Sequence, residues 1–378
     1  MGTSYRWHPG TDRLTGRWAL TTALQPDELM SSWLVRLAHR QGCDVLSLTG
    51  NLWPGWRCWT QDLDRGMSDE HIRPLSVTTG LSAQACRAAT LGSIIERVAD
   101  ISSRTRTRWP WTTTLGSRNT RRRGGLQFCP GCLVDDAVPH YRLHWRLVWH
   151  TACDRHGCAL LDRCPGCQAP LEPHRVDIRT GSFTSCARCG LDLRAAPTEA
   201  VDPATLAFQA AADRAVQDGL AKAFGHPIPA PDWFALSAFL TTFLRRSSYE
   251  SGGPLRRVLD VLEIDSPSLG RADRGVDLES LRVDNRHALF TALGSLLELD
   301  PDALASALCT AAITRQALCP KGQALPGILD SMASALPERT VPERKRTTRV
   351  TQPSGPRSRR AVETMMATLE RRIARGKR

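Results

Sequence analysis

Hydrophobic residues recur at helical spacing in several parts of the chain, which predicts a mainly α protein. The N-terminal example covers residues 27–41, with Pro26 suited to its first turn and Gly42 to its end. Its apolar stripe consists of Leu29, Met30, Trp33, Leu34, Leu37 and Ala38. A stripe of this kind indicates a helix that packs on a core, not a cofactor site.

Two further helices are predicted over residues 69–77 and 81–91, joined by Thr-Thr-Gly at 78–80. Ser82 is a suitable N-cap for the second helix, and Gly80 lies in the connection. Such a pair is compatible with a helix-turn-helix, although an ordinary helical hairpin has the same pattern.

Beyond Pro203 the composition changes to Ala and Leu, and the periodicity predicts an all-α domain. Its helical stretches are residues 205–224, 233–246, 254–264, 285–299 and 302–318. From about Pro337 the chain becomes polar, basic and rich in Pro, Ser and Thr, so we expect it to be disordered in the free protein. A basic helix is predicted within this tail, over about 360–374.

Positive charge is concentrated in two segments. Residues 339–378 contain thirteen Lys or Arg and three Glu, so this tail carries +10 of the formal +12. Residues 103–125 contain seven arginines and no acid. Both segments suit a polyanion such as DNA. The alternative is that the tail is merely solvated. The chain has only four lysines, so its many arginines can reflect genome composition and need not indicate a polyanionic partner. The candidate contacts are Arg118, Arg121, Arg122, Arg123, Arg344, Lys345, Arg346, Arg357, Arg359 and Arg360.

The longest apolar run, residues 233–244, is too short to cross a bilayer, and the N-terminus has no apolar signal region. We therefore expect a soluble, cytosolic protein without membrane partners, whose thiols stay reduced.

About half of the thirteen cysteines lie in C-x-x-C or C-x-x-H pairs, which favours metal binding over disulfides. The others are predicted to be buried thiols: Cys43, Cys58, Cys86, Cys158, Cys309 and Cys319.

The cysteine pairs predict two structural zinc ions, because zinc needs four such donors at tetrahedral geometry. The pairs are, in order, Cys129 and Cys132, Cys153 and His156, Cys164 and Cys167, and Cys186 and Cys189. Sequential pairing gives one site of three cysteines and a histidine, then one of four cysteines. A cross-braced pairing is left open by the spacing. Cys158, His150 and His144 are rival ligands, but they break the spacing and are predicted to be bystanders.

A helix is predicted over residues 139–150, between the first two pairs. Its aromatic residues, including Tyr141, Trp145 and Trp149, are expected to pack on the zinc core. Arg142 and Arg146, four residues apart, share another face and are candidates for contacts to phosphate or to a partner.

The sequence argues against an enzyme. In the zinc deaminases the general base comes from an H-x-E motif that precedes P-C-x-x-C, and no H-x-E occurs in this chain. C-P-G-C can also serve thiol exchange, but two copies with downstream partner pairs favour metal. None of the four lysines ends a phosphate-binding G-x-x-x-x-G-K loop, so any ATP hydrolysis must come from another protein.

The pattern FCPGCLVDD, PHYRLHWRL, TACDRHGCALLDRCPGCQAPL and SCARCGLDL resembles the TniQ (TnsD-like) family of transposon target-selection proteins. DELMSSWLVRLAHRQG at 27–42 and TTGLS at 78–82 extend the resemblance to about residues 20–195. It implies zinc ligation by Cys129, Cys132, Cys153, His156, Cys164, Cys167, Cys186 and Cys189. Cys158 and the long basic tail depart from the shared pattern.

The resemblance implies a non-catalytic adaptor. It would recognise target DNA, or a CRISPR effector bound to DNA, and recruit an AAA+ ATPase regulator that brings the transposase. The alternative is a zinc-containing transcription regulator that binds an operator as a homodimer without a transposition partner.

The predicted organisation has four parts. An N-terminal helical domain with a helix-turn-helix covers residues 1–125, and tandem zinc fingers cover 126–197. An α-helical C-terminal domain covers 198–337, and the basic tail covers 338–378.

Overall fold

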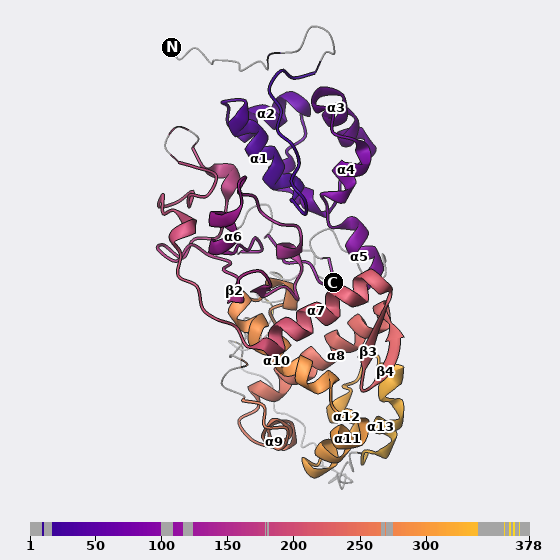
Figure 1. The fold of residues 1–378 in the computed structure, drawn as a ribbon. Coiled ribbons are helices and arrows are strands. Elements are labelled where there is room, and N and C mark those ends of the chain that lie inside the picture. Colours follow the sequence, from indigo (N-terminus) through magenta and orange to yellow (C-terminus); the bar gives the residue numbers. More distant parts are fainter. Residues whose placement is uncertain are drawn as a thin grey trace. The chain divides into compact units, whose positions relative to one another are not determined.

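The computed structural model describes residues 10, 17–99, 109–115, 124–177, 179, 181–265, 269 and 275–338, with 359, 363, 366 and 370. By its internal contacts the chain divides into two units, Met1–Pro337 and Glu338–Arg378. The first unit is mainly helical with two short hairpins, which confirms the predicted fold class (Figure 1). The domain boundaries predicted inside this unit stay predictions.

The first four N-terminal helices share a core of their own, whereas the fifth packs into the core of the C-terminal helices. These helices are α1 (Met30–Arg40), α2 (Val45–Leu52), α3 (Asp69–Thr79), α4 (Ala83–Ala88) and α5 (Gly92–Val98), with 3-10 turns η1 (Cys58–Thr60) and η2 (Leu63–Arg65). The predicted stripe of α1 is buried. The helix begins three residues later than expected, because Asp27 has a positive φ of 58° and Leu29 is still extended.

The two helices predicted around Thr-Thr-Gly are present as α3 and α4. Gly80 ends α3 in the left-handed conformation, with φ of 79°, and the Ser82 side chain accepts a hydrogen bond from the Ala85 amide at the start of α4. That these helices form a DNA-binding helix-turn-helix stays a prediction.

The cysteine-rich region has little regular structure. It contains α6 (Pro130–Asp135), the strands β1 (Ala152–Cys153) and β2 (Cys158–Ala159), and the 3-10 turns η4 (His144–Arg146), η5 (Pro173–Arg175) and η6 (Leu193–Ala195). The helix predicted over residues 139–150 is wrong, since η4 is its only helical turn. The backbone of this segment bonds to distant partners instead: Leu29 donates to the Tyr141 carbonyl, and Leu143 donates to the Asp27 carbonyl.

The C-terminal part of the first unit is helical, as predicted, except that the stretch predicted over 302–318 is interrupted at Ala312, which has a positive φ of 56°. This part contains α7 (Pro203–Asp218), α8 (Ala230–Tyr249), α9 (Pro254–Val261), η7 (Leu278–Ser280), α10 (Val283–Leu297), α11 (Pro301–Thr310), α12 (Arg315–Leu318), η8 (Gly327–Leu329) and α13 (Asp330–Ala335). The helix predicted over 205–224 ends early, because Gly219 is left-handed and residues Leu220–Ala223 and His226–Pro229 pair as the hairpin β3–β4.

One apolar core joins the cysteine-rich region to the C-terminal helices. The rings of Trp111 and Trp149 each lie within 5.1 Å of Phe234 on α8, measured between ring centroids. The buried guanidinium of Arg286 on α10 donates to the Val148 carbonyl at 2.6 Å and to Gln127 at 3.0 Å. The cysteine-rich region is therefore held by these helices and does not form an independent surface lobe.

The tail is described at only a few positions. There, Arg359, Glu363, Met366 and Glu370 are helical, and the rest of the predicted helix and of the segment expected to be disordered lies outside the described residues. Within the described part of the chain, no helix is both long and apolar enough to span a bilayer.

Candidate metal centres

The first group of metal-binding side chains is arranged by two short turns. Cys129 is the N-cap of α6, where its sulfur accepts a hydrogen bond from the Cys132 amide and Pro130 occupies the first turn. A side chain on Gly131 would place Cβ only 2.6 Å from the His156 ring. The C-P-G-C sequence thus brings both sulfurs to one side and leaves room for the histidine.

The donor atoms of this first group fit a tetrahedral zinc ion. The Sγ atoms of Cys132 and Cys153 are 3.5 Å apart, and each lies 3.4 Å from His156 Nδ1. Zinc–ligand bond lengths imply about 3.8 Å between two sulfurs and about 3.6 Å between sulfur and nitrogen. All four donors, with Cys129, lie within 4.8 Å of one another.

His156 is oriented by a carboxylate that sequence reasoning missed. Its Nε2 lies 2.9 Å from an oxygen of Asp135, at the end of α6. Such a partner fixes the tautomer that leaves Nδ1 free for the metal. Nothing in the spacing marks Asp135, because it meets His156 only when the two turns fold together.

The rival ligands lie outside this group. Cys158 pairs with Cys153 across the β1–β2 hairpin, and its sulfur is 3.6 Å from Cys129 Sγ. His144 and His150 face carboxylates instead, Asp27 and Asp213. In the described residues these three side chains complete no donor set.

The second group contains Cys164, Cys167, Cys186 and Cys189. The Sγ separations are 3.6 Å for Cys164 with Cys189 and 3.7 Å for Cys167 with Cys186. These values also fit tetrahedral zinc. The four pairs are thus grouped sequentially, and the structure contains no cross-braced arrangement of the eight residues.

The two groups differ in their exposure to solvent. Three members of the first group are buried, whereas Cys189 is exposed and Cys167 is half-buried. Burial raises the pKa of the Cys164 thiol to about 12, whereas the Leu191 backbone amide lowers the pKa of Cys189 to about 7. Because metal binds the thiolate, binding here must displace protons from the buried sulfurs.

This difference predicts an order of metal release. A chelator should remove the ion of the second group first, because solvent reaches Cys189 without unfolding of the chain. Release followed with a colorimetric zinc indicator should show two phases, and Cys189→Ser should remove the fast phase. The matched variant Cys153→Ser should instead affect the slow phase. Release of two equivalents of zinc in a single kinetic phase would contradict the prediction.

Arg146 is a structural residue. It is fully buried, with Nη2 2.6 Å from Asp62 Oδ2 and Nη1 3.2 Å from Asp64 Oδ2. It also donates to the Thr113 carbonyl at 2.8 Å. The prediction that Arg146 contacts phosphate or a partner is therefore wrong, because its guanidinium is enclosed by carboxylates from the N-terminal helical region.

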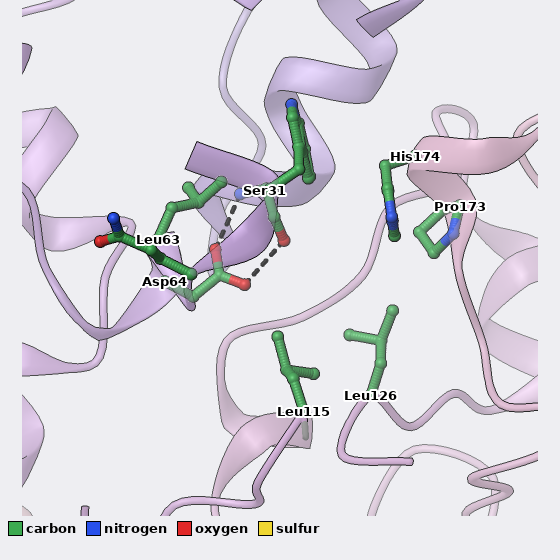
Figure 2. Close-up of a pocket in the computed structure, with 9 residues that line it drawn as sticks. Ser31, Leu63, Asp64, Leu115, Leu126, Pro173 and His174 are labelled. Carbon is green, nitrogen blue, oxygen red and sulfur yellow. Dashed lines mark hydrogen bonds between the residues drawn. The ribbon is translucent and has the colours of Figure 1, made fainter. Parts of the chain in front are cut away.

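A cavity of about 20 Å³ lies beside these carboxylates, and Figure 2 shows its lining. Asp64 accepts hydrogen bonds there from the Ser31 amide at 2.8 Å and the Ser31 hydroxyl at 2.7 Å. The volume is on the scale of one water molecule and is too small for an organic substrate. Asp64, which belongs to η2, therefore links this turn both to α1 and to the cysteine-rich region.

The other candidate nucleic-acid contacts have mixed outcomes. Arg142 is mostly buried, binds both oxygens of Asp136 at 2.7 and 2.8 Å and lies over Trp145, so its contact role stays a prediction. Arg359 is exposed and forms an ion pair with Glu363. The remaining candidates lie outside the described residues: Arg118, Arg121, Arg122, Arg123, Arg344, Lys345, Arg346, Arg357 and Arg360.

Comparison with known proteins finds one family. Residues 19–160 match the TniQ family model. This segment contains helices α1 to α6 and the complete first metal group, and it ends before the second group. No curated protein matches the chain significantly.

Proposed function

We propose that this chain, a protein of the TniQ family, selects the insertion site of a transposon as a non-catalytic adaptor. The TniQ domain implies a role in transposition target selection and partners in the transposition machinery. The finer proposal is that the chain links target DNA, or a DNA-bound CRISPR effector, to an AAA+ ATPase regulator, which brings the transposase.

The observation that carries this proposal is the TniQ match over residues 19–160, which includes the first metal group. The donor sets support a structural use of metal. Each group offers four protein donors, enough to close a tetrahedron, whereas a catalytic zinc keeps one position open for water or substrate. We propose that Cys129, Cys132, Cys153 and His156 hold one zinc ion, and that the four cysteines of the second group hold another.

A transposition assay tests the proposal. The reading frames beside this gene would first be searched for a transposase and an AAA+ ATPase. Any found would be expressed in cells with a marked element, with and without the chain, and insertion sites would be mapped by sequencing. We expect insertions at a defined site only when the chain is present. An unchanged distribution, together with repression of a neighbouring promoter by the chain, would favour the alternative transcription regulator.

The basic tail gives a separate prediction about DNA. Deletion of residues 339–378 removes +10 of formal charge and should weaken binding to duplex DNA of any sequence. The plot of log affinity against log salt should also become shallower, by about 0.9 for each phosphate that the tail no longer neutralises. Fluorescence anisotropy at several salt concentrations would measure both. The control is a tail of equal length with Gln at each basic position, which should behave like the deletion; an unchanged slope would show that the tail is only solvated.

A further inference from the structure

A groove of about 410 Å³ lies where α1 meets the cysteine-rich region. Its walls come from segments far apart in the sequence: residue 22, the second half of α1, the loop at 138–139, and the loop before Cys186. The lining residues are Thr22, Arg36, His39, Arg40, Val138, Pro139, Ser182, Phe183, Thr184 and Arg194. The volume is in the range of sites that take a large side chain or a small ligand.

The wall of the groove is largely apolar and fixed in place. Val138 is 38% exposed and lies next to Pro139. The Phe183 ring packs edge-on against Tyr141 and His39, with centroid separations of 5.3 and 6.5 Å. Burial lowers the pKa of His39, so this ring is neutral at neutral pH and adds no charge. An apolar side chain would therefore find a preformed site between Val138 and Phe183.

The rim of the groove is basic, and none of its lining residues is acidic. Two of its arginines already have partners, Arg36 with Glu28 at 2.5 Å and Arg194 with Asp192 at 2.8 Å. Arg40, on the last turn of α1, is exposed and has no carboxylate partner among the described residues. One available cation suits a single carboxylate, whereas a nucleic-acid backbone is held through several phosphates.

We propose that this groove binds an extended segment of a partner protein, with one large apolar side chain between Val138 and Phe183 and a neighbouring carboxylate at Arg40. The proposal rests on the adaptor function, since an adaptor needs a site for a protein partner. It also gives the second metal group a role: the loop that carries Phe183 leads directly into the ligand Cys186, so the bound metal holds one wall of the groove.

The test uses the full chain and a phage-displayed library of random peptides. Selected peptides should pair an aromatic or large aliphatic residue with an adjacent Asp or Glu. Fluorescent copies of these peptides should bind Val138→Lys and Arg40→Glu at least about tenfold more weakly than the unaltered chain. The matched controls Val134→Lys and Lys222→Glu change exposed residues outside the groove and should leave binding unchanged.

Charge exchange makes the test specific. A peptide whose acidic residue is replaced by Lys should bind Arg40→Glu more tightly than it binds the unaltered chain. The proposal is overturned if no selected peptide depends on Val138 and Arg40. It is also overturned if a single-stranded oligonucleotide displaces the peptides and itself loses binding in Val138→Lys, which would assign the groove to nucleic acid. Peptide binding needs no transposition protein, so failure of the adaptor function would be seen separately, in the insertion assay.

Discussion

Replacement of Cys129 by Ser should release one of two bound metal ions and unfold the chain around α6. Cys129 is fully buried and is both a candidate metal ligand and the N-cap of α6. Structural zinc contributes about 10–16 kcal/mol of apparent binding free energy in small modules, and a site with three protein donors retains only part of it. The segment around this group has little regular structure, so we expect the ion to supply much of its local order.

The loss of folded structure in this variant should extend into the N-terminal helices. Residues 141–143 bond to the start of α1 through the Leu29 amide and the Asp27 carbonyl, and the Tyr141 amide donates to Ser32 at 3.0 Å. Loss of the first metal should therefore loosen α1, which the spacing of the cysteines does not suggest. We expect new proteolytic cleavage both near residue 140 and near residue 28.

Metal content by mass spectrometry and limited proteolysis would measure these effects. The control is Cys158→Ser, since Cys158 lies 3.6 Å from Cys129 Sγ but outside the donor set. This variant should keep two ions and the original cleavage pattern. If Cys129→Ser also kept two ions, Cys158 would have to be a ligand and the proposed donor set would be incorrect.

Replacement of Arg146 by Met should lower the free energy of unfolding by about 3–5 kcal/mol, because it leaves buried Asp64 without its cation and Asp62 with Arg65 alone. The residues affected are Asp62 and Asp64, which bond to Arg146 at 2.6 and 3.2 Å. Urea unfolding at saturating zinc would measure the change. Arg155→Met is the matched control: Arg155 also binds a carboxylate, Asp136, at 2.8 Å, but its side chain is 47% exposed, so solvent screens the pair and the loss should be much smaller.

The loss of unfolding free energy in Arg146→Met, relative to the unaltered chain, should depend on pH. Burial raises the pKa of Asp64 to about 6 even beside Arg146, and loss of that cation should raise it further. A carboxyl group with a raised pKa stabilises the fold at low pH, and this stability is lost as the pH rises through the folded-state pKa. The variant should therefore be weakest above neutral pH and recover in mild acid. Adding Asp62→Asn and Asp64→Asn should restore much of the stability; a deficit that stays constant with pH would exclude a role for unpaired carboxylates.

The cysteine groups and the N-terminal helices could be predicted from local features. A C-x-x-C or C-x-x-H turn places two donors on one side by backbone geometry alone, so the eight residues stand out without any knowledge of the fold. The stripe of α1 and the caps at Gly80 and Ser82 are equally local. The choice between sequential and cross-braced pairing was not local, since both satisfy the same spacings.

Arg146 shows where local reasoning fails. Its spacing from Arg142 indicated a solvent-facing helix, but the backbone of this segment finds partners in α1 and at Trp111, so the helix does not form. Its carboxylate partners lie 84 and 82 residues earlier in the chain. A side chain enclosed by groups at such sequence separation leaves no periodic signal.

The sequence by itself indicated the candidate metal donors, the helical content and the resemblance to the TniQ family, because each depends on residue types at short, fixed spacings. Only the tertiary structure decided which arginines are buried, which aspartate orients His156, and where an apolar groove with a basic rim is left open. These features depend on segments that meet across long stretches of chain. Their positions follow from packing and burial, which no local pattern encodes.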